Sequence, residues 1–222
     1  MTVMGASQST RIEDEFQDLA DQTGFSLEQI VNLHKRFKQL SENEETISRE
    51  NLERIPALED NPIRAQIIEA FFDKRNLRQD AAGSLQEIGF AEFLMVMSHF
   101  RPLPPKVMTP EERERLRRQK LRFLFNMHDT DNDGTITLEE YRKVVEDMLS
   151  KSGDMGIQTA KAITDAAMLE VSKINESHMG PDEVYDRITF EHFLEILKSL
   201  EIESKMHIRF LNMDTTTIRC GK

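Results

Sequence analysis

The sequence predicts an all-α protein with two lobes, each built from two helix-loop-helix units. Four short segments resemble one another, since each begins with isoleucine and ends on an apolar residue, and they recur at intervals of about 40–50 residues. They cover 47–52, 88–93, 136–141 and 188–193. Apolar residues at helical spacing stand on both sides of each segment, and a proline-rich stretch separates the second segment from the third.

The helices are predicted from apolar residues that recur every three or four positions. The first begins with Ser26 as N-cap and Gln29 as its partner in a capping box. The strongest start signal is Thr109 followed by Pro110, an N-cap and a proline at the first helical position. The predicted helices cover 26–40, 63–71, 93–100, 109–127, 138–149, 157–174 and 190–200.

Four prolines between positions 102 and 110 interrupt the helical pattern and indicate a linker. A single unit of about 40 residues would be marginally stable, so we expect the units to pair within each lobe. The predicted division is an N-terminal segment over 1–22, an N-lobe over 23–100, a linker over 101–110 and a C-lobe over 111–222.

The composition restricts the possible partners. Of 222 residues, 38% are hydrophobic and 31% charged, as in globular proteins. The formal net charge of −11 argues against nucleic acid and suits a cation or a basic peptide. No apolar run approaches the roughly 20 residues of a membrane helix, and no signal peptide is recognisable. Because Cys220 is the single cysteine, no internal disulfide can form. We therefore expect a cytosolic monomer.

Residues 129–140 carry the strongest functional signal. They match the calcium-loop pattern D-x-[DN]-x-[DN]-G-x5-E, with a predicted helix on either side. Calcium takes six to eight oxygen ligands at about 2.3–2.6 Å, and a loop of this length can wrap around one ion. Gly134 permits the sharp turn in the middle of the loop. The expected ligands are Asp129, Asp131, Asp133, the backbone carbonyl of Thr135, a water at Thr137 and both carboxylate oxygens of Glu140.

A bidentate Glu140 favours calcium, because magnesium requires a smaller octahedral shell at about 2.0–2.1 Å. Four carboxylates in one loop repel one another, so binding of a cation is expected to order the loop. We expect one calcium ion per chain, with magnesium as its competitor.

The other three loops lack the ligands of a calcium site. The first has no glycine, is too short and has Asn51 where the glutamate belongs. The second, over 73–92, is too long and places Arg75 and Arg78 where carboxylates are needed. The fourth ends on His192, which we interpret as an ordinary solvated residue, and has no acidic cluster upstream.

We expect these empty loops to serve as scaffolding. Paired loops are joined by a short two-stranded ladder, so Ile47 is predicted to lie opposite Ile88, and Ile136 opposite Ile188. The alternative is that one of the three binds metal weakly.

With these repeats and this site, the chain resembles the EF-hand superfamily and, within it, the calcineurin B homologous protein family, over nearly its whole length. The resemblance is carried by MGA at 4–6, TGFS at 23–26, LHKRFKQLS at 33–41, FFDKRNLR at 71–78, KLRFLF at 120–125 and KMHIRFLNM at 205–213. It implies a two-lobed EF-hand protein with four EF-hand units in two pairs, three of them degenerate. One intact loop also distinguishes the chain from calcineurin B itself, in which all four loops bind.

The resemblance implies a function. Such a protein binds an amphipathic helix in the cytoplasmic tail of a plasma-membrane sodium/proton exchanger and promotes the exchanger's maturation, surface stability and activity. The resemblance also implies inhibition of the phosphatase calcineurin through its catalytic subunit. The expected locations are the cytoplasm, the cytoplasmic face of the plasma membrane and the nucleus. No catalytic constellation stands out, so no enzymatic activity is expected. A calcium buffer and a phosphatase regulatory subunit without a transporter role remain as alternatives.

The resemblance further implies a myristoyl group at Gly5. The pattern M-G-x-x-x-[ST] fits residues 4–9 only if translation starts at Met4. Either Met4 is the start or the product is unmodified, and we favour the former. One acyl chain gives only marginal membrane binding, so the exchanger would supply the second attachment.

Two other features have more than one interpretation. The basic run from Arg113 to Arg122 could contact anionic lipid, but the interleaved glutamates favour a solvated helix face with ion pairs. The C-terminal segment 202–213, whose apolar residues from Met206 onward follow helical spacing, is a candidate lid over the target groove.

Overall fold

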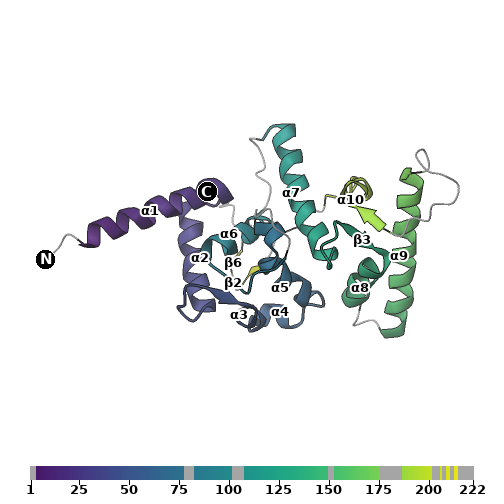
Figure 1. Ribbon diagram of the computed structural model, residues 1–222, viewed down its shortest axis with the longest axis horizontal. Helices are drawn as coiled ribbons and strands as arrows, with labels where there is room; N and C mark the ends of the chain where they lie inside the picture. Colours follow the sequence, from purple (N-terminus) through teal and green to yellow (C-terminus); the bar gives the residue numbers. More distant parts are fainter. Residues whose placement is uncertain are drawn as a thin grey trace, which may run out of the picture.

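The computed structural model describes residues 4–77, 83–101, 108–149, 153–175, 187–201, 206, 209–210 and 213–214. These residues are mostly helical, which confirms the all-α fold class predicted from the sequence. Figure 1 shows α7 (Pro110–His128) standing between the N-terminal and the C-terminal groups of helices. None of the helices described has a stretch long and apolar enough to cross a bilayer.

The N-terminal group, here the N-lobe, comprises α1 (Met4–Thr23), α2 (Leu27–Leu40), α3 (Arg49–Glu53), α4 (Pro56–Glu59), α5 (Arg64–Phe72), the 3-10 helix η1 (Lys74–Leu77) and α6 (Phe90–Ser98). The C-terminal group, the C-lobe, comprises α8 (Leu138–Leu149), α9 (Gly153–Asn175) and α10 (Phe190–Ile196).

Two predicted helix starts are confirmed by their caps. The Gln29 amide donates to Ser26 Oγ over 3.2 Å, and the Ser26 amide donates to Gln29 Oε1 over 2.9 Å. Thr109 and Glu112 exchange the same pair of bonds at the start of α7, over 3.2 and 2.9 Å. Each side chain satisfies an amide that would otherwise have no partner in the first helical turn.

The sequence analysis did not predict α1. In the structure Leu19 is buried in the N-lobe core and Phe16 packs against that core. The helix ends at Thr23 because the next residue, Gly24, has a left-handed φ of 69°, and the Gly24 amide donates to the Ala20 carbonyl over 2.7 Å. The spacing of Ile12, Phe16 and Leu19 is the signal that could have predicted this helix.

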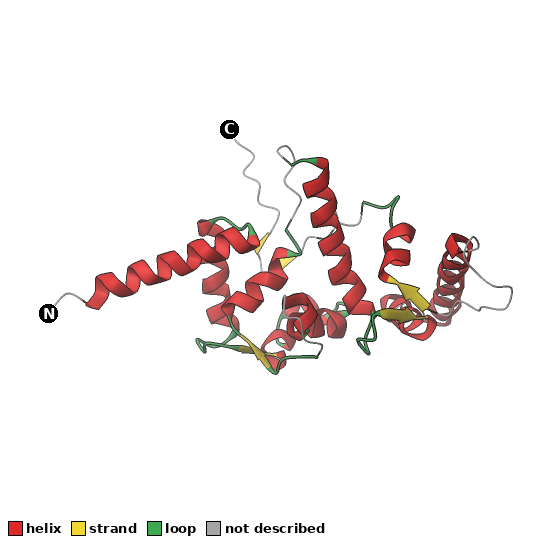
Figure 2. Cartoon of the chain, turned by 45° about the horizontal axis from the view of Figure 1, so that its top comes forward, coloured by secondary structure: helices red, strands yellow, loops and turns green. Residues whose placement is uncertain are grey.

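The predicted ladders are confirmed. Strand β1 (Ile47–Ser48) pairs antiparallel with β2 (Glu87–Ile88), and Ile47 lies opposite Ile88. Strand β3 (Thr135–Thr137) pairs with β4 (Arg187–Thr189), and Ile136 lies opposite Ile188. Figure 2 shows these strands as short arrows among the helices. Each ladder joins the two loops of one pair and buries its isoleucines.

Two predictions near the C-terminus differ from the structure. Helix α10 ends at Ile196 and not at Leu200, which is 51% exposed, so burial does not stabilise a further turn. The helix that the apolar spacing after Met206 predicted is wrong, because β5 (Arg209–Phe210) pairs there with β6 (Met213–Asp214). Apolar residues three positions apart fit a hairpin equally well, and here they lie opposite one another in it.

The candidate lid is described only in part. Met206 is buried in the N-lobe core, while residues 202–205, 207–208 and 211–212 lie outside the described residues. A lid over 202–213 therefore stays a prediction.

Helix α7 is shared by two hydrophobic cores. Its Phe123 packs into the N-lobe core, whereas Leu121 and Phe125, on another face, pack into the C-lobe core. The cores therefore do not separate at the predicted linker over 101–110, of which 102–107 lie outside the described residues. The predicted division of the chain stays a prediction.

The basic run of α7 is used for internal contacts. Arg117 lies 3.8 Å from Glu114, and Arg118 forms an ion pair with Glu191 of α10. Lys120 is 4% exposed, and its ammonium donates to the His99 carbonyl over 2.8 Å. The ion pairs agree with the expected helix face, but Lys120 is buried and therefore not solvated as expected.

Candidate metal centre

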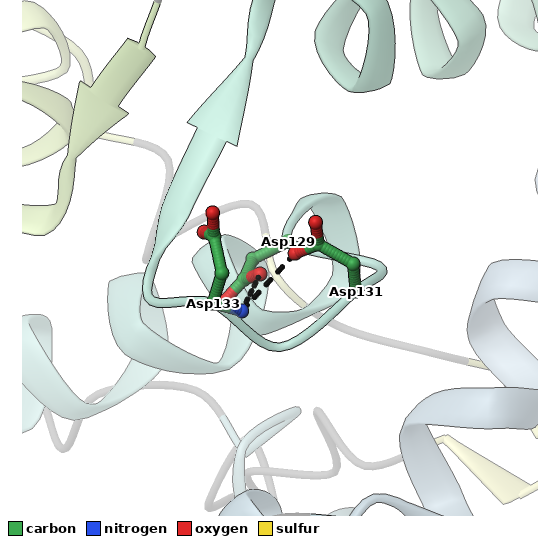
Figure 3. A group of neighbouring side chains, drawn as sticks. All are labelled: Asp129, Asp131 and Asp133. Carbon is green, nitrogen blue, oxygen red and sulfur yellow. Dashed lines mark hydrogen bonds between the residues drawn. The ribbon is translucent and has the colours of Figure 1, made fainter.

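The third loop begins where α7 ends. Asp129 is the C-cap of this helix, and its carboxylate lies beside those of Asp131 and Asp133. One carboxylate oxygen from each of the three lies within 4.8 Å of the others (Figure 3). The structure thus brings together three of the predicted site residues around one point.

Backbone amides hold the aspartates in this arrangement. The Asp133 amide donates to one oxygen each of Asp129 and Asp131, both over 3.1 Å. The Gly134 amide donates to Asp129 Oδ2, also over 3.1 Å. Gly134 has a φ of 87°, a conformation that a residue with a Cβ rarely adopts, so the glycine is required by the backbone itself.

Glu140 lies across the loop and is bound to both of its ends. Its Oε2 accepts from the amide and hydroxyl of Thr137, both over 2.9 Å. Its Oε1 accepts from the amide and hydroxyl of Thr130, both over 2.8 Å. The structure therefore does not bring this carboxylate into the aspartate group. A cation bound by Glu140 would replace these donors.

The two threonines of the predicted site lie at the ends of β3. The amide and hydroxyl of Thr135 donate to Asp133 Oδ1 over 2.8 and 2.7 Å. Thr137 caps the following helix, because its hydroxyl accepts from the Glu140 amide over 3.2 Å. Both residues therefore already help to shape the loop through its carboxylates.

The carboxylates differ in their pKa. Hydrogen bonds from Thr135, and then the charge of Arg187, lower the pKa of Asp133. Burial acts to raise the pKa of Glu140, but the bonds from Thr137 and Thr130 outweigh it, and this pKa is lowered. Burial raises the pKa of Asp129, although Arg75 opposes the shift. Asp133 and Glu140 are therefore held in the charged form that a cation requires.

Arg75 links the second loop to this site. Its Nη1 donates to Asp129 Oδ2 over 2.6 Å, and its Nη2 donates to the backbone carbonyls of Asp129 and Asn126, both over 3.0 Å. Its Nη2 also donates to Asp73 Oδ2 over 2.7 Å. The sequence placed Arg75 only as a residue that empties the second loop. Its contact with Asp129 depends on how the lobes pack, and no local pattern signals it. Arg78 lies outside the described residues.

All four loops share one feature at their last position. Asn51, Glu92, Glu140 and His192 each accept a hydrogen bond from the backbone amide three residues earlier, at the start of the following helix. The interpretation of His192 as an ordinary solvated residue is wrong. It is half-buried, and its Nδ1 accepts from the Thr189 amide over 3.3 Å. The final loop position thus starts a helix whether or not the loop can bind metal.

The fold and this site define an EF-hand calcium-binding protein. The model of the EF hand domain matches residues 120–148, which contain the third loop, the C-terminal part of α7 and nearly all of α8. Paired helix-loop-helix units joined by short ladders agree with this class.

Relatives identify the family. The chain is 50% identical to calcineurin B homologous protein 3 of Homo sapiens over 215 aligned residues. The alignment covers 97% of this chain and 99% of the relative. It is 54% identical over 212 residues to the protein of that name from Xenopus laevis, with 96% and 98% covered. The Gallus gallus protein is 49% identical over 211 residues, with 95% and 97% covered. The chain belongs to the calcineurin B homologous protein family, as the sequence predicted, and is a calcium-binding regulatory protein.

Proposed function

We propose that this chain is a calcium-binding adaptor for an amphipathic helix in the cytoplasmic tail of a plasma-membrane sodium/proton exchanger. In this role it promotes the maturation, surface stability and activity of the exchanger. The proposal includes inhibition of calcineurin through its catalytic subunit. Within the family, we propose that the chain corresponds to calcineurin B homologous protein 3, which is also called tescalcin.

The observation that carries the proposal is that the N-lobe has a well-packed core although its two loops do not match the calcium pattern. Its core includes Phe37, Phe71 and Phe93, each at most 1% exposed. A calcium buffer needs only loops that bind metal, whereas a target-binding protein needs a stable surface. Retention of this lobe supports the adaptor over the buffer.

A cavity between the lobes supports helix binding. It has a volume of about 420 Å³, and α6 and α7 contribute Met95, Leu116 and Phe123 to its lining. Among the described residues, those that line it include Arg101 and Arg122 but no Asp or Glu. The cavity therefore suits an amphipathic helix that presents apolar and acidic side chains, and not the basic peptide that the net charge of the chain favoured.

The calcium ion would be held by the residues predicted from the loop. They are Asp129, Asp131, Asp133, the carbonyl of Thr135, a water at Thr137 and both oxygens of Glu140. The convergent aspartates and the turn at Gly134 support this assignment. When bound, the ion supplies the positive charge that offsets repulsion between the carboxylates. One such site per chain is proposed, with magnesium as the competitor.

Membrane attachment through a myristoyl group on Gly5 is part of the proposal. Gly5 lies at the start of α1. The protein would act as a monomer in the cytoplasm, at the cytoplasmic face of the plasma membrane and in the nucleus, without a nucleic-acid partner. Intact mass after co-expression with the acyl transferase tests the modification, and an unmodified product initiated at Met1 would contradict it.

Calorimetry with synthetic helices tests the adaptor role. The full chain, with and without calcium, is titrated with the exchanger-tail helix, with the helical arm of the phosphatase catalytic subunit, and with a proline-substituted exchanger helix as control. We expect saturable binding of the exchanger helix and none of the control. Binding of the phosphatase arm alone would favour a phosphatase subunit. A chain that binds calcium but neither helix, and exposes no apolar surface to a dye, would be a buffer.

A further inference from the structure

We propose that Arg75 is a built-in competitor of calcium. It lowers the calcium affinity of the loop 129–140 and couples metal binding to the contact between the two lobes. This inference rests on the calcium site proposed above and adds to it a regulating residue from the neighbouring unit.

The position of the guanidinium is well defined. Asp73 accepts from its Nε over 3.0 Å and from its Nη2 over 2.7 Å, and so holds it from the N-lobe side. From the C-lobe side, Asp129 accepts over 2.6 Å. The side chain of Arg75 is 20% exposed and that of Asp129 is 0% exposed. Water therefore screens the charge of Arg75 poorly at the first position of the calcium loop.

The sign of the effect follows from charge. Without metal, Arg75 offsets the repulsion between the loop carboxylates and stabilises the empty loop. With a dication in the loop, the guanidinium remains close because Asp73 holds it, and the two positive charges repel. Both contributions oppose calcium binding. Asp129 does not need Arg75 for its orientation, since the amides of Asp133 and Gly134 also donate to it.

The same residue belongs to the contact between the lobes. Arg75 lines the cavity of about 420 Å³ and also a second cavity of about 370 Å³. It therefore lies between the two cavities, at a point where the lobes are in contact. Next to it, the Asn126 amide group donates to Asn76 Oδ1 over 2.9 Å, and both side chains are buried. Coupling is reciprocal: because Arg75 opposes calcium, calcium must weaken the bond between Arg75 and Asp129 and loosen this contact.

The first loop shows that the chain also supplies a cation to another empty loop. The Lys38 ammonium donates to the Glu44 carbonyl over 3.1 Å and pairs with Glu45. Those contacts stay within the first unit, whereas Arg75 extends to the calcium loop of the other lobe. Competition is therefore expected for Arg75 and not for Lys38.

Calorimetric calcium titration of the full chain tests the affinity. Arg75→Gln is expected to tighten calcium binding about tenfold, within the range of about 5–150-fold that is typical of coupled sites. Arg75→Lys keeps the charge and is expected to stay closer to the wild type. Arg49→Gln is the matched control: it removes the same charge from the N-lobe, where Arg49 pairs with Glu69, and should leave the affinity unchanged. Weaker or unchanged binding in Arg75→Gln would overturn the proposal.

Hydrogen exchange tests the coupling independently of affinity. In the wild type, calcium is expected to speed exchange of the Lys74 and Asn76 amides, which donate to the Gly83 and Asp73 carbonyls. In Arg75→Gln these amides should exchange fast with or without calcium. Protection of the Asp133 and Gly134 amides by calcium in both proteins would support the site. Protection there without any response in η1 would overturn only the coupling, whereas the absence of any calcium response would overturn the site as well.

Discussion

The two lobes are built on the same plan but are stabilised differently. The N-lobe core contains the fully buried rings of Phe37, Phe71, Phe72 and Phe93, and its loops do not match the calcium pattern. Among the residues that the structure describes, the C-lobe core is smaller and contains Phe125, Phe190 and Phe193 beside the loop that matches the calcium pattern. From this comparison we expect aromatic burial to hold the N-lobe pair without metal, and the C-lobe pair, with less burial, to depend more on its metal.

The largest expected effect concerns aromatic burial in the N-lobe. Phe93 is 0% exposed, and its ring centroid lies 5.6 Å from Phe37 and 5.8 Å from Phe71. Phe93→Ala is expected to lower the free energy of unfolding by about 3–5 kcal/mol, because it leaves a cavity in a packed core. Urea denaturation measures this change. Leu27→Ala, at a position 46% exposed, is the control and should change stability little. A small loss in Phe93→Ala would contradict the comparison.

The next effect concerns the C-lobe and its metal. Calcium at a free concentration of 100 times its Kd should raise the free energy of unfolding by about 2.7 kcal/mol, because it binds only the folded loop. Glu140→Gln is expected to abolish this gain by removing a charged ligand. Glu139→Gln, at the exposed neighbouring position, should keep it. Thermal unfolding with and without calcium measures the shift, and an equal gain in Glu140→Gln would refute the ligand assignment.

Helix caps should contribute equally in the N-lobe and in the shared helix α7. Ser26→Ala in the N-lobe and Thr109→Ala at the start of α7 each remove a side-chain acceptor for an amide of the first turn. Each is expected to lower the free energy of unfolding by about 1 kcal/mol. Chemical denaturation of both variants tests this. A clear difference between them would mean that the N-lobe and α7 differ in how strongly a cap stabilises the first helical turn.

The smallest expected effect is a pH dependence in the N-lobe. Burial, and then the charge of Lys38, lower the pKa of His34, whose ring lies 4.8 Å from that of Phe90. The native state therefore binds the proton less readily than the unfolded state, whose pKa is about 6.5. The His34 contribution is complete above that pH and is lost as the pH falls below it and through the lower pKa of the native state. His34→Gln should flatten the pH profile of stability between pH 7 and 5, and an unchanged profile would contradict the assignment.

Local patterns predicted much of this molecule, and tertiary contacts account for what they missed. The caps at Ser26 and Thr109, the ladders and the loop 129–140 depend on residues close in sequence or on the regular pairing of loops. The bond between Arg75 and Asp129 depends on lobe packing, which no spacing encodes. The cap formed by His192 was missed because histidine is an unusual residue at that position. The shared role of α7 was missed because a proline-rich stretch was taken as the boundary.

Helix α7 has a consequence for any attempt to divide the chain. Since Phe123 completes one core and Leu121 and Phe125 the other, neither half is a free-standing module. A fragment cut at the prolines would either expose an apolar face of α7 or lack the α7 side chains that complete its core, and we expect it to aggregate. A protease that nicks the same stretch in the intact protein should leave two pieces that stay together until denaturant is added.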